Sequence, residues 1–104
     1  MKRLVIDDIR SLPIESVTVR TAAEGIEKIN SEPWDEIWLD FDLGGRPYET
    51  DDELTIMPLV KVLEEKEWAV MPTIYIHTQN PVGRQRIKAA LTRYQIVDVA
   101  ITVT

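Results

Sequence analysis

The chain has no cysteine and only one histidine among its 104 residues. The first absence excludes disulfides, iron–sulfur clusters and thiolate nucleophiles, and a single histidine leaves little for a structural zinc site. No run of about 18 apolar residues occurs, so no membrane-spanning helix is expected. The apolar stretch before Asp7 and Asp8 is also far too short for a secretory signal. These absences predict a soluble, intracellular, cytoplasmic protein that does not bind membranes.

Basic charge is scarce as well. Twelve Lys and Arg face eighteen Asp and Glu, which gives a net charge of −6. A surface of that sign repels a polynucleotide, so duplex DNA binding is not expected. The 12.0 kDa chain is 44% hydrophobic, enough for one core, and we expect residues 1–104 to form one domain.

The average charge conceals two segments of opposite sign. Residues 32–53 contain nine acidic side chains against the single base Arg46, whereas residues 77–94 contain four bases and no acid. Segregation of this kind often reflects two solvated faces. The alternative is that the two segments meet at one site.

Hydrophobic periodicity predicts five strands and three helices. The strands are expected at residues 2–6, 17–20, 36–40, 73–77 and 96–103. One helix should follow Thr21, which has Glu24 three residues on, as in a capping box. Another should follow Asn80, an N-cap type with proline next to it. A third is expected to begin near Thr55, with Pro58 in its first turn.

Strands that alternate with helices predict a single doubly wound, mostly parallel five-stranded sheet of the flavodoxin type, covered on both faces. The connection between the first two strands is short and the sequence stops at the last one. We therefore expect a shortened first helix and no final helix. In the common strand order the first strand lies between the second and third, and ligands bind at the carboxyl ends of the strands.

Acidic side chains follow two of these predicted strands: Asp7 and Asp8 the first, Asp40 and Asp42 the third. Four carboxylates within a few ångströms repel one another unless a cation joins them. Oxygen ligands suit Mg²⁺, Mn²⁺ or Ca²⁺. Asp8 or Asp42 alone could equally cap a turn. The convergent set predicts a metal site, with Mg²⁺ or Mn²⁺ as cofactor.

The segment after the fourth strand offers positive charge. The first amides of the next helix, at Val82, Gly83 and Arg84, would point toward the strand ends with the positive end of the helix dipole. Arg84 adds a fork suited to phosphate, and His77 a proton donor or acceptor, although a histidine there could simply bond a backbone carbonyl. Gly83 costs a helix roughly 1 kcal/mol and is expected to let a ligand approach. The predicted phosphate-binding residues are Asn80, Val82, Gly83 and Arg84.

Four motifs extend this pattern over nearly the whole chain. They are Asp7-Asp8-Ile9-Arg10, Arg20-Thr21, Leu39-Asp40-Phe41-Asp42-Leu43-Gly44 and His77-Thr78-Gln79-Asn80-Pro81-Val82-Gly83-Arg84. In this order they resemble the cyclic-phosphate processing receiver-like domains, small relatives of response-regulator receivers found in bacteria and their phages. The last motif is the most specific. The resemblance implies that Asp40 stands where a receiver has its phosphoacceptor, and Asp7 and Asp8 where it has metal ligands.

Three motif residues depart from that family. Ile9 replaces Glu, Phe41 replaces His and Thr78 replaces Ser. The change at Phe41 leaves His77 as the sole imidazole, which argues against a two-histidine mechanism. The lysine and the helix that follow a signalling receiver's last strand are also missing. Ordinary two-component signalling is therefore not expected.

The resemblance implies metal-supported binding or processing of a phosphate ester, such as a 2′,3′-cyclic phosphate. The chain would then be a metal-dependent cyclic phosphodiesterase or phosphohydrolase with His77 and Asp40 as catalytic residues. Its partner would be a phosphate-containing small molecule or an RNA terminus.

Two alternatives stay open. In one, the chain is a non-catalytic, degenerate receiver that binds a protein partner, phage-encoded and directed at a host protein. Ile9, Phe41 and the acidic residues within 49–53 favour this hypothesis. In the other, Asp40 is a free-standing phosphoacceptor.

Overall fold

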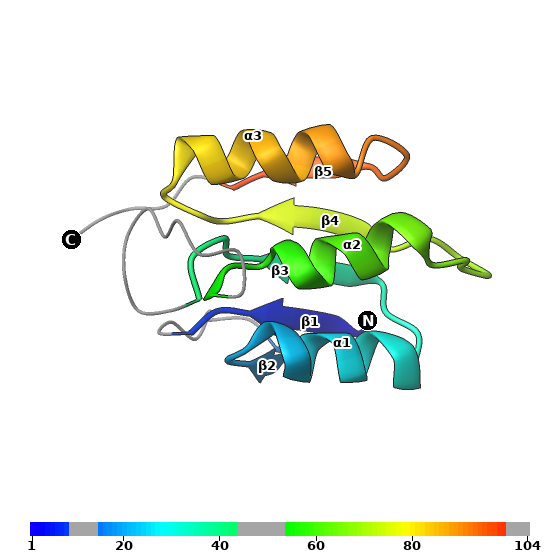
Figure 1. Ribbon diagram of the computed structural model, residues 1–104. Coiled ribbons are helices and arrows are strands. Elements are labelled where there is room, and N and C mark those ends of the chain that lie inside the picture. The colour runs from blue at the N-terminus through cyan, green and yellow to red at the C-terminus, as the bar shows by residue number, and fades with distance from the viewer. Residues whose placement is uncertain (9–14, 44–53, 100–104) are drawn as a thin grey trace.

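The sheet contains five strands in the order β2-β1-β3-β4-β5 (Figure 1). In this computed structural model, which describes residues 1–8, 15–43 and 54–99, the strands are β1 (Arg3–Ile6), β2 (Val17–Val19), β3 (Glu36–Leu39), β4 (Thr73–Ile76) and β5 (Ile96–Asp98). All four pairings between neighbours are parallel. The predicted five-stranded parallel sheet, with its first strand between the second and third, is confirmed.

The strands end close to where the sequence predicts. β3 and β4 each stop one residue earlier than expected, so Asp40 and His77 come directly after them. β5 is shorter than the predicted 96–103, and residues 100–104 of that prediction lie outside the described residues.

Three helices connect the strands: α1 (Ala22–Ser31), α2 (Met57–Glu65) and α3 (Pro81–Ala90). The Thr21 hydroxyl oxygen accepts from the Glu24 N–H at 3.1 Å, while the Glu24 carboxylate accepts from the Arg20 N–H at 3.3 Å. The Asn80 side-chain oxygen accepts from the Gly83 N–H at 3.0 Å. Both predicted N-caps are confirmed, and each satisfies an amide that the first helical turn leaves unbonded.

The start of α2 differs from the prediction. Its N-cap is Ile56, which makes no side-chain capping bond. The hydroxyl oxygen of Thr55, the predicted cap, nevertheless accepts from the Met57 N–H at 3.1 Å. Thr55 itself forms an antiparallel bridge with Asp42, one residue before the N-cap. Pro58 does lie in the first turn, where a missing N–H costs nothing. No helix among the described residues is long and apolar enough to cross a membrane.

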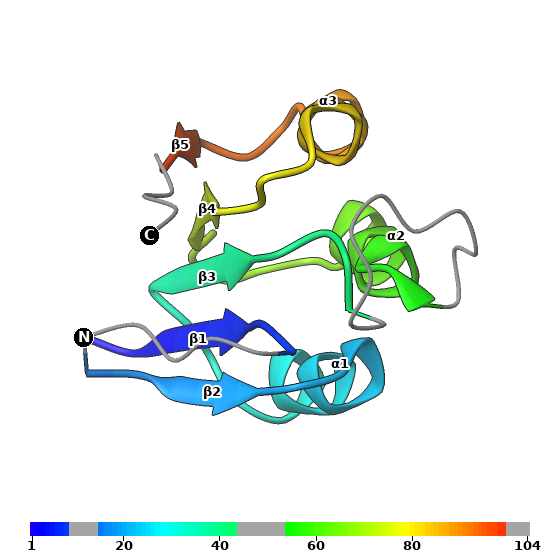
Figure 2. The same ribbon diagram turned by 90° about the vertical axis from the view of Figure 1, so that its left-hand side faces the viewer.

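In the described part of the chain, all three helices lie on the same face of the sheet (Figure 2). Ile29 of α1, Leu59 of α2 and Ile87 of α3 share one apolar cluster with the strands. The crossovers from β2 to β3, β3 to β4 and β4 to β5 all advance in one direction, and right-handed crossovers of one direction place their helices on one face. The described helices thus meet the expectation for one face, and cover on the other face stays a prediction. The shortened first helix and absent final helix concern residues 9–14 and 100–104, outside the described ranges.

Side chains alternate between the two faces along each strand. On the helix face, the central strands contribute fully buried aliphatic residues: Leu4, Ile6, Ile37, Leu39, Ile74 and Ile76. The opposite face carries Val5, Trp38 and Tyr75, which are partners in register across β1, β3 and β4. The Trp38 and Tyr75 rings stack with centroids 4.4 Å apart and an interplanar angle of 4°.

The ladder continues one residue past the strand ends. The Asp40 N–H donates to the Ile6 carbonyl and the His77 N–H to the Leu39 carbonyl, both at 3.1 Å. In register, Asp7, Asp40 and His77 follow Ile6, Leu39 and Ile76. These three residues therefore lie side by side, directly after neighbouring strands, at the carboxyl edge of the sheet.

Candidate metal and phosphate site

Three aspartates converge at the carboxyl ends of β1 and β3. Asp7, Asp8 and Asp40 each offer a carboxylate oxygen within 4.8 Å of the others, with Asp7 and Asp40 buried and Asp8 half-buried. Parallel neighbours β1 and β3 bring these residues together because their ends align. The donor set is all oxygen and negatively charged, which fits a hard divalent cation such as Mg²⁺ or Mn²⁺. The half-buried Asp8 leaves the cluster a side toward solvent.

The fourth predicted ligand, Asp42, is not part of this cluster. Its bridge to Thr55 sets its position, and its carboxylate oxygens lie 3.3 and 3.5 Å from the Asn80 side-chain nitrogen. The structure thus brings three of the four predicted ligands together and places Asp42 beside the start of α3.

His77 adjoins the cluster through Asp7. Its Nε2 lies 3.1 Å from Asp7 Oδ2, and its side chain is only 2% exposed. An ionised carboxylate can only accept hydrogen bonds, so Nε2 is the donor of this pair when Asp7 is ionised. The acid–base role predicted for His77 stays a prediction, and such a role requires a substrate to reach a ring that the protein encloses.

Two of the three amides of the predicted anion cradle at the start of α3, those of Gly83 and Arg84, bind groups of the protein itself. The Gly83 N–H donates to the Asn80 side chain, and the Arg84 N–H donates to the Asn80 carbonyl at 2.9 Å. Val82 is 67% exposed. The buried Phe41 ring packs against Gly83 so closely that a Cβ there would lie 2.3 Å from Phe41 Cγ. The sequence predicts that Gly83 leaves room for a ligand, but in the structure the Phe41 ring fills that room.

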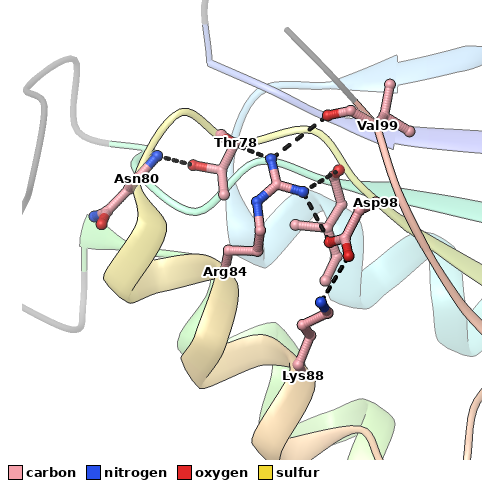
Figure 3. Close-up of polar contacts among 7 residues, drawn as sticks. Thr78, Asn80, Arg84, Lys88, Asp98 and Val99 are labelled. Carbon is pink, nitrogen blue, oxygen red and sulfur yellow. Dashed lines mark hydrogen bonds and ion pairs between the residues drawn. The ribbon is translucent and has the colours of Figure 1, made fainter.

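Arg84 is engaged within the fold (Figure 3). Its guanidinium donates to the carbonyls of Ile76 and Thr78, at 3.3 and 2.6 Å, and to Asp98 Oδ1 at 2.8 Å. A longer contact of 3.5 Å reaches the Val99 carbonyl. The prediction of a fork presented to phosphate does not match these contacts, because both terminal nitrogens already bind groups at the ends of β4 and β5.

Other bases of residues 77–94 are also used structurally. The Lys88 ammonium lies 2.6 Å from the second Asp98 oxygen. Hydrogen bonds from Lys88 and then Arg84 lower the pKa of the Asp98 carboxyl. The Arg93 guanidinium donates to three carbonyls at the end of α2, from Leu63, Glu64 and Lys66. Much of the basic segment therefore stabilises the fold.

Asp98 is the residue that the sequence interpretation missed. Asp98 is the last residue of β5, and Asp7 and Asp40 directly follow β1 and β3. An acid at a strand end is therefore the pattern that could have identified it. The contact between His77 and Asp7 was also missed. Seventy residues separate the pair, and only the strand order brings them together.

Comparisons with known proteins agree with this architecture. Residues 2–93 match the family model described as the cyclic-phosphate processing receiver domain. Among solved structures, the chain is similar to a CheY-like response regulator receiver domain from Methylobacillus flagellatus, with a TM-score of 0.68 and 10% sequence identity over 99% of this chain and 87% of that chain. At that identity the likeness shows the fold alone. A comparison with curated proteins finds no match.

Proposed function

Because this chain belongs to the cyclic-phosphate processing receiver domain family, we propose that it binds and processes a phosphate ester at a divalent cation held by Asp7, Asp8 and Asp40. A cyclic phosphate, such as a 2′,3′-cyclic nucleotide or RNA terminus, is the substrate class we propose. The observation that carries this proposal is the convergence of three carboxylates within 4.8 Å at adjacent strand ends.

The electrostatics of the cluster support a cation. Like charges at this separation repel one another and raise the free energy of a partly buried site. A bound cation would offset this repulsion. Such a cation, when bound, neutralises phosphoryl oxygens and so assists attack at phosphorus. Asp8, the half-buried member, marks the side from which a phosphate could enter.

Hydrolysis of a cyclic phosphate would form one bond from a water oxygen to phosphorus and break one of the two ring P–O bonds. The proton of the water ends on the leaving alkoxide. Asp40, beside Asp7 and Asp8, is the residue we assign to the reacting side of the cluster. Phosphate is held chiefly by the cation in this proposal, since the Arg84 guanidinium and the Gly83 amide bind protein groups.

The test is hydrolysis of 2′,3′-cyclic nucleotides in the presence of Mg²⁺ or Mn²⁺. We expect turnover by the unaltered protein and a loss of at least about a hundredfold in Asp40→Asn, as for removal of a group acting in the transition state. Asp98→Asn is the matched control, because it removes an acid from a strand end outside the cluster and should keep activity. Absence of turnover in the unaltered protein would overturn the enzymatic part of the proposal.

A second candidate function is supported by Phe41. Its ring packs against Gly83 at the start of α3, where the sequence predicts a phosphate-binding site. A receiver fold that binds a protein partner without catalysis needs no open phosphate-binding site. In that case a stoichiometric partner recovered from lysate would still bind Asp40→Asn, and no cyclic phosphate would be hydrolysed.

A further inference from the structure

His77 is held rigidly at the cluster by its surroundings. Its backbone N–H continues the ladder by donating to the Leu39 carbonyl, and the residue is 1% exposed. The ring lies next to Trp38, with centroids 6.1 Å apart and planes inclined by 54°. Backbone and ring packing therefore both limit the positions that the imidazole can take.

Among the residues that the structure describes, its side chain makes one polar contact, and that contact is with Asp7. Nε2 lies 3.1 Å from Asp7 Oδ2, and Asp7 is fully buried. A buried carboxylate orients according to the hydrogen bonds that it accepts. The imidazole thus acts on one oxygen of a residue whose carboxylate also faces Asp8 and Asp40.

The other ring nitrogen, Nδ1, is buried and has no hydrogen-bond partner within residues 1–8, 15–43 and 54–99. Buried polar atoms are usually satisfied, so a histidine retained for stability alone would be expected to bond through both nitrogens. Here the fold leaves one nitrogen unsatisfied and directs the other at Asp7. This asymmetry indicates that the ring is placed for its effect on Asp7.

We propose that His77 is a positioning residue, whose Nε2–H fixes the orientation of Asp7 toward the cation site. The proposal rests on the cation site of the proposed function, and it assigns His77 a task that needs no contact with substrate. Partners of this kind, which orient a metal ligand by a hydrogen bond, commonly change metal affinity by about 10- to 100-fold when removed.

The test compares two substitutions by calorimetric titration of the whole chain with Mn²⁺. His77→Gln keeps an N–H donor at about the reach of Nε2, whereas His77→Met fills similar space with no donor. We expect His77→Met to bind Mn²⁺ about 10- to 100-fold more weakly, and His77→Gln to remain within about threefold of the unaltered protein. Far-ultraviolet circular dichroism without metal verifies that each variant is folded, and His77→Asn, whose amide is too short to reach Asp7, replaces His77→Met if the latter does not fold.

The outcomes separate this proposal from the one beneath it. If the unaltered protein binds no Mn²⁺, the cation site fails and the positioning role fails with it. If the unaltered protein binds Mn²⁺ and a folded His77→Met binds it equally well, only the positioning role is overturned. Equal loss in the Gln and Met variants would also overturn it, because the donor would not be what matters.

A second measurement needs no metal. Nitrogen-15 correlation spectra of the imidazole should show a proton on Nε2 in the metal-free protein. The opposite tautomer would overturn the proposal directly, since Nδ1 does not face Asp7.

Discussion

The carboxyl edge of the sheet has two halves that treat charge in different ways. At the ends of β1 and β3, three carboxylates offer oxygens within 4.8 Å of one another. At the ends of β4 and β5, Asp98 lies between Lys88 and Arg84, so acid and base alternate (Figure 3). The second half stabilises the fold through its own ion pairs. The first half concentrates one sign of charge, which is the arrangement expected where a fold is built to hold a ligand.

The largest difference between the halves should appear when Mn²⁺ is added. A ligand that binds only the folded protein stabilises it by about 2.7 kcal/mol at a hundred times its Kd, which for a chain of this size raises Tm by about 10–20 °C. Asp40→Asn should lose most of that shift, and Asp98→Asn should keep it. Scanning calorimetry with and without Mn²⁺ measures both, and equal shifts in the two variants would erase the distinction.

Gly83→Ala tests the packing at the start of α3. A Cβ at this position would lie 2.3 Å from Phe41 Cγ, so the substitution should lower the free energy of unfolding by about 1–3 kcal/mol. Phe41→Leu should relieve part of the clash, and denaturant unfolding of the four proteins in the cycle gives the coupling. Additive effects would mean that the two residues do not meet as described.

Arg84→Met should weaken the β4 and β5 half without affecting the cation. The guanidinium donates to the Ile76 and Thr78 carbonyls and to Asp98, so its loss should cost about 1–2 kcal/mol of unfolding free energy. Arg84→Lys should restore little, because an ammonium cannot span that fork. Mn²⁺ affinity by titration should stay within about twofold, because the contacts given for Arg84 are with groups at the ends of β4 and β5 and not with the three aspartates. A large fall in Mn²⁺ affinity would mean that the two halves of the edge act as one site.

The smallest expected effect is the pH dependence of Asp98. Its pKa is lowered in the folded protein, so its pairing contributes stability above the unfolded value near 3.8, and that contribution is lost as the pH falls through the folded value. Its side chain is 44% exposed, so the effect should be well below 1 kcal/mol. The Tm difference between the unaltered protein and Asp98→Asn should therefore shrink from pH 6 to pH 3. A constant difference would mean that the pairing does not contribute.

The sequence predicts the acidic half of this edge well, for a geometric reason. Parallel strands in register bring their carboxyl ends together, so acids placed directly after two neighbouring strands must lie close. Asp7, Asp8 and Asp40 need nothing more than the strand order to meet. The caps at Thr21 and Asn80 are equally predictable, because a capping bond spans only three residues.

The other half could not be predicted, because its side chains choose among partners that are distant in sequence. Arg84 and Gly83 are residue types that often bind phosphate. In the structure, however, Arg84 donates to Asp98, and Gly83 packs against the Phe41 ring. Asp42 follows Asp40 by two residues, but its bridge to Thr55 turns it toward Asn80. The type of a residue shows which partners its side chain can bind, and only the tertiary structure shows which of these partners lies within reach.

The extension of the ladder past the strand ends should affect the rate of amide exchange and the rate at which a cation binds. The amide protons of Asp7, Asp40 and His77 are all bonded to neighbouring strands, at Val19, Ile6 and Leu39 respectively. Such amides should exchange with solvent only when the central sheet opens, as slowly as those of the core. A cation would therefore meet a backbone that is already in place, and the rate of binding would be set by the shedding of water and the settling of side chains.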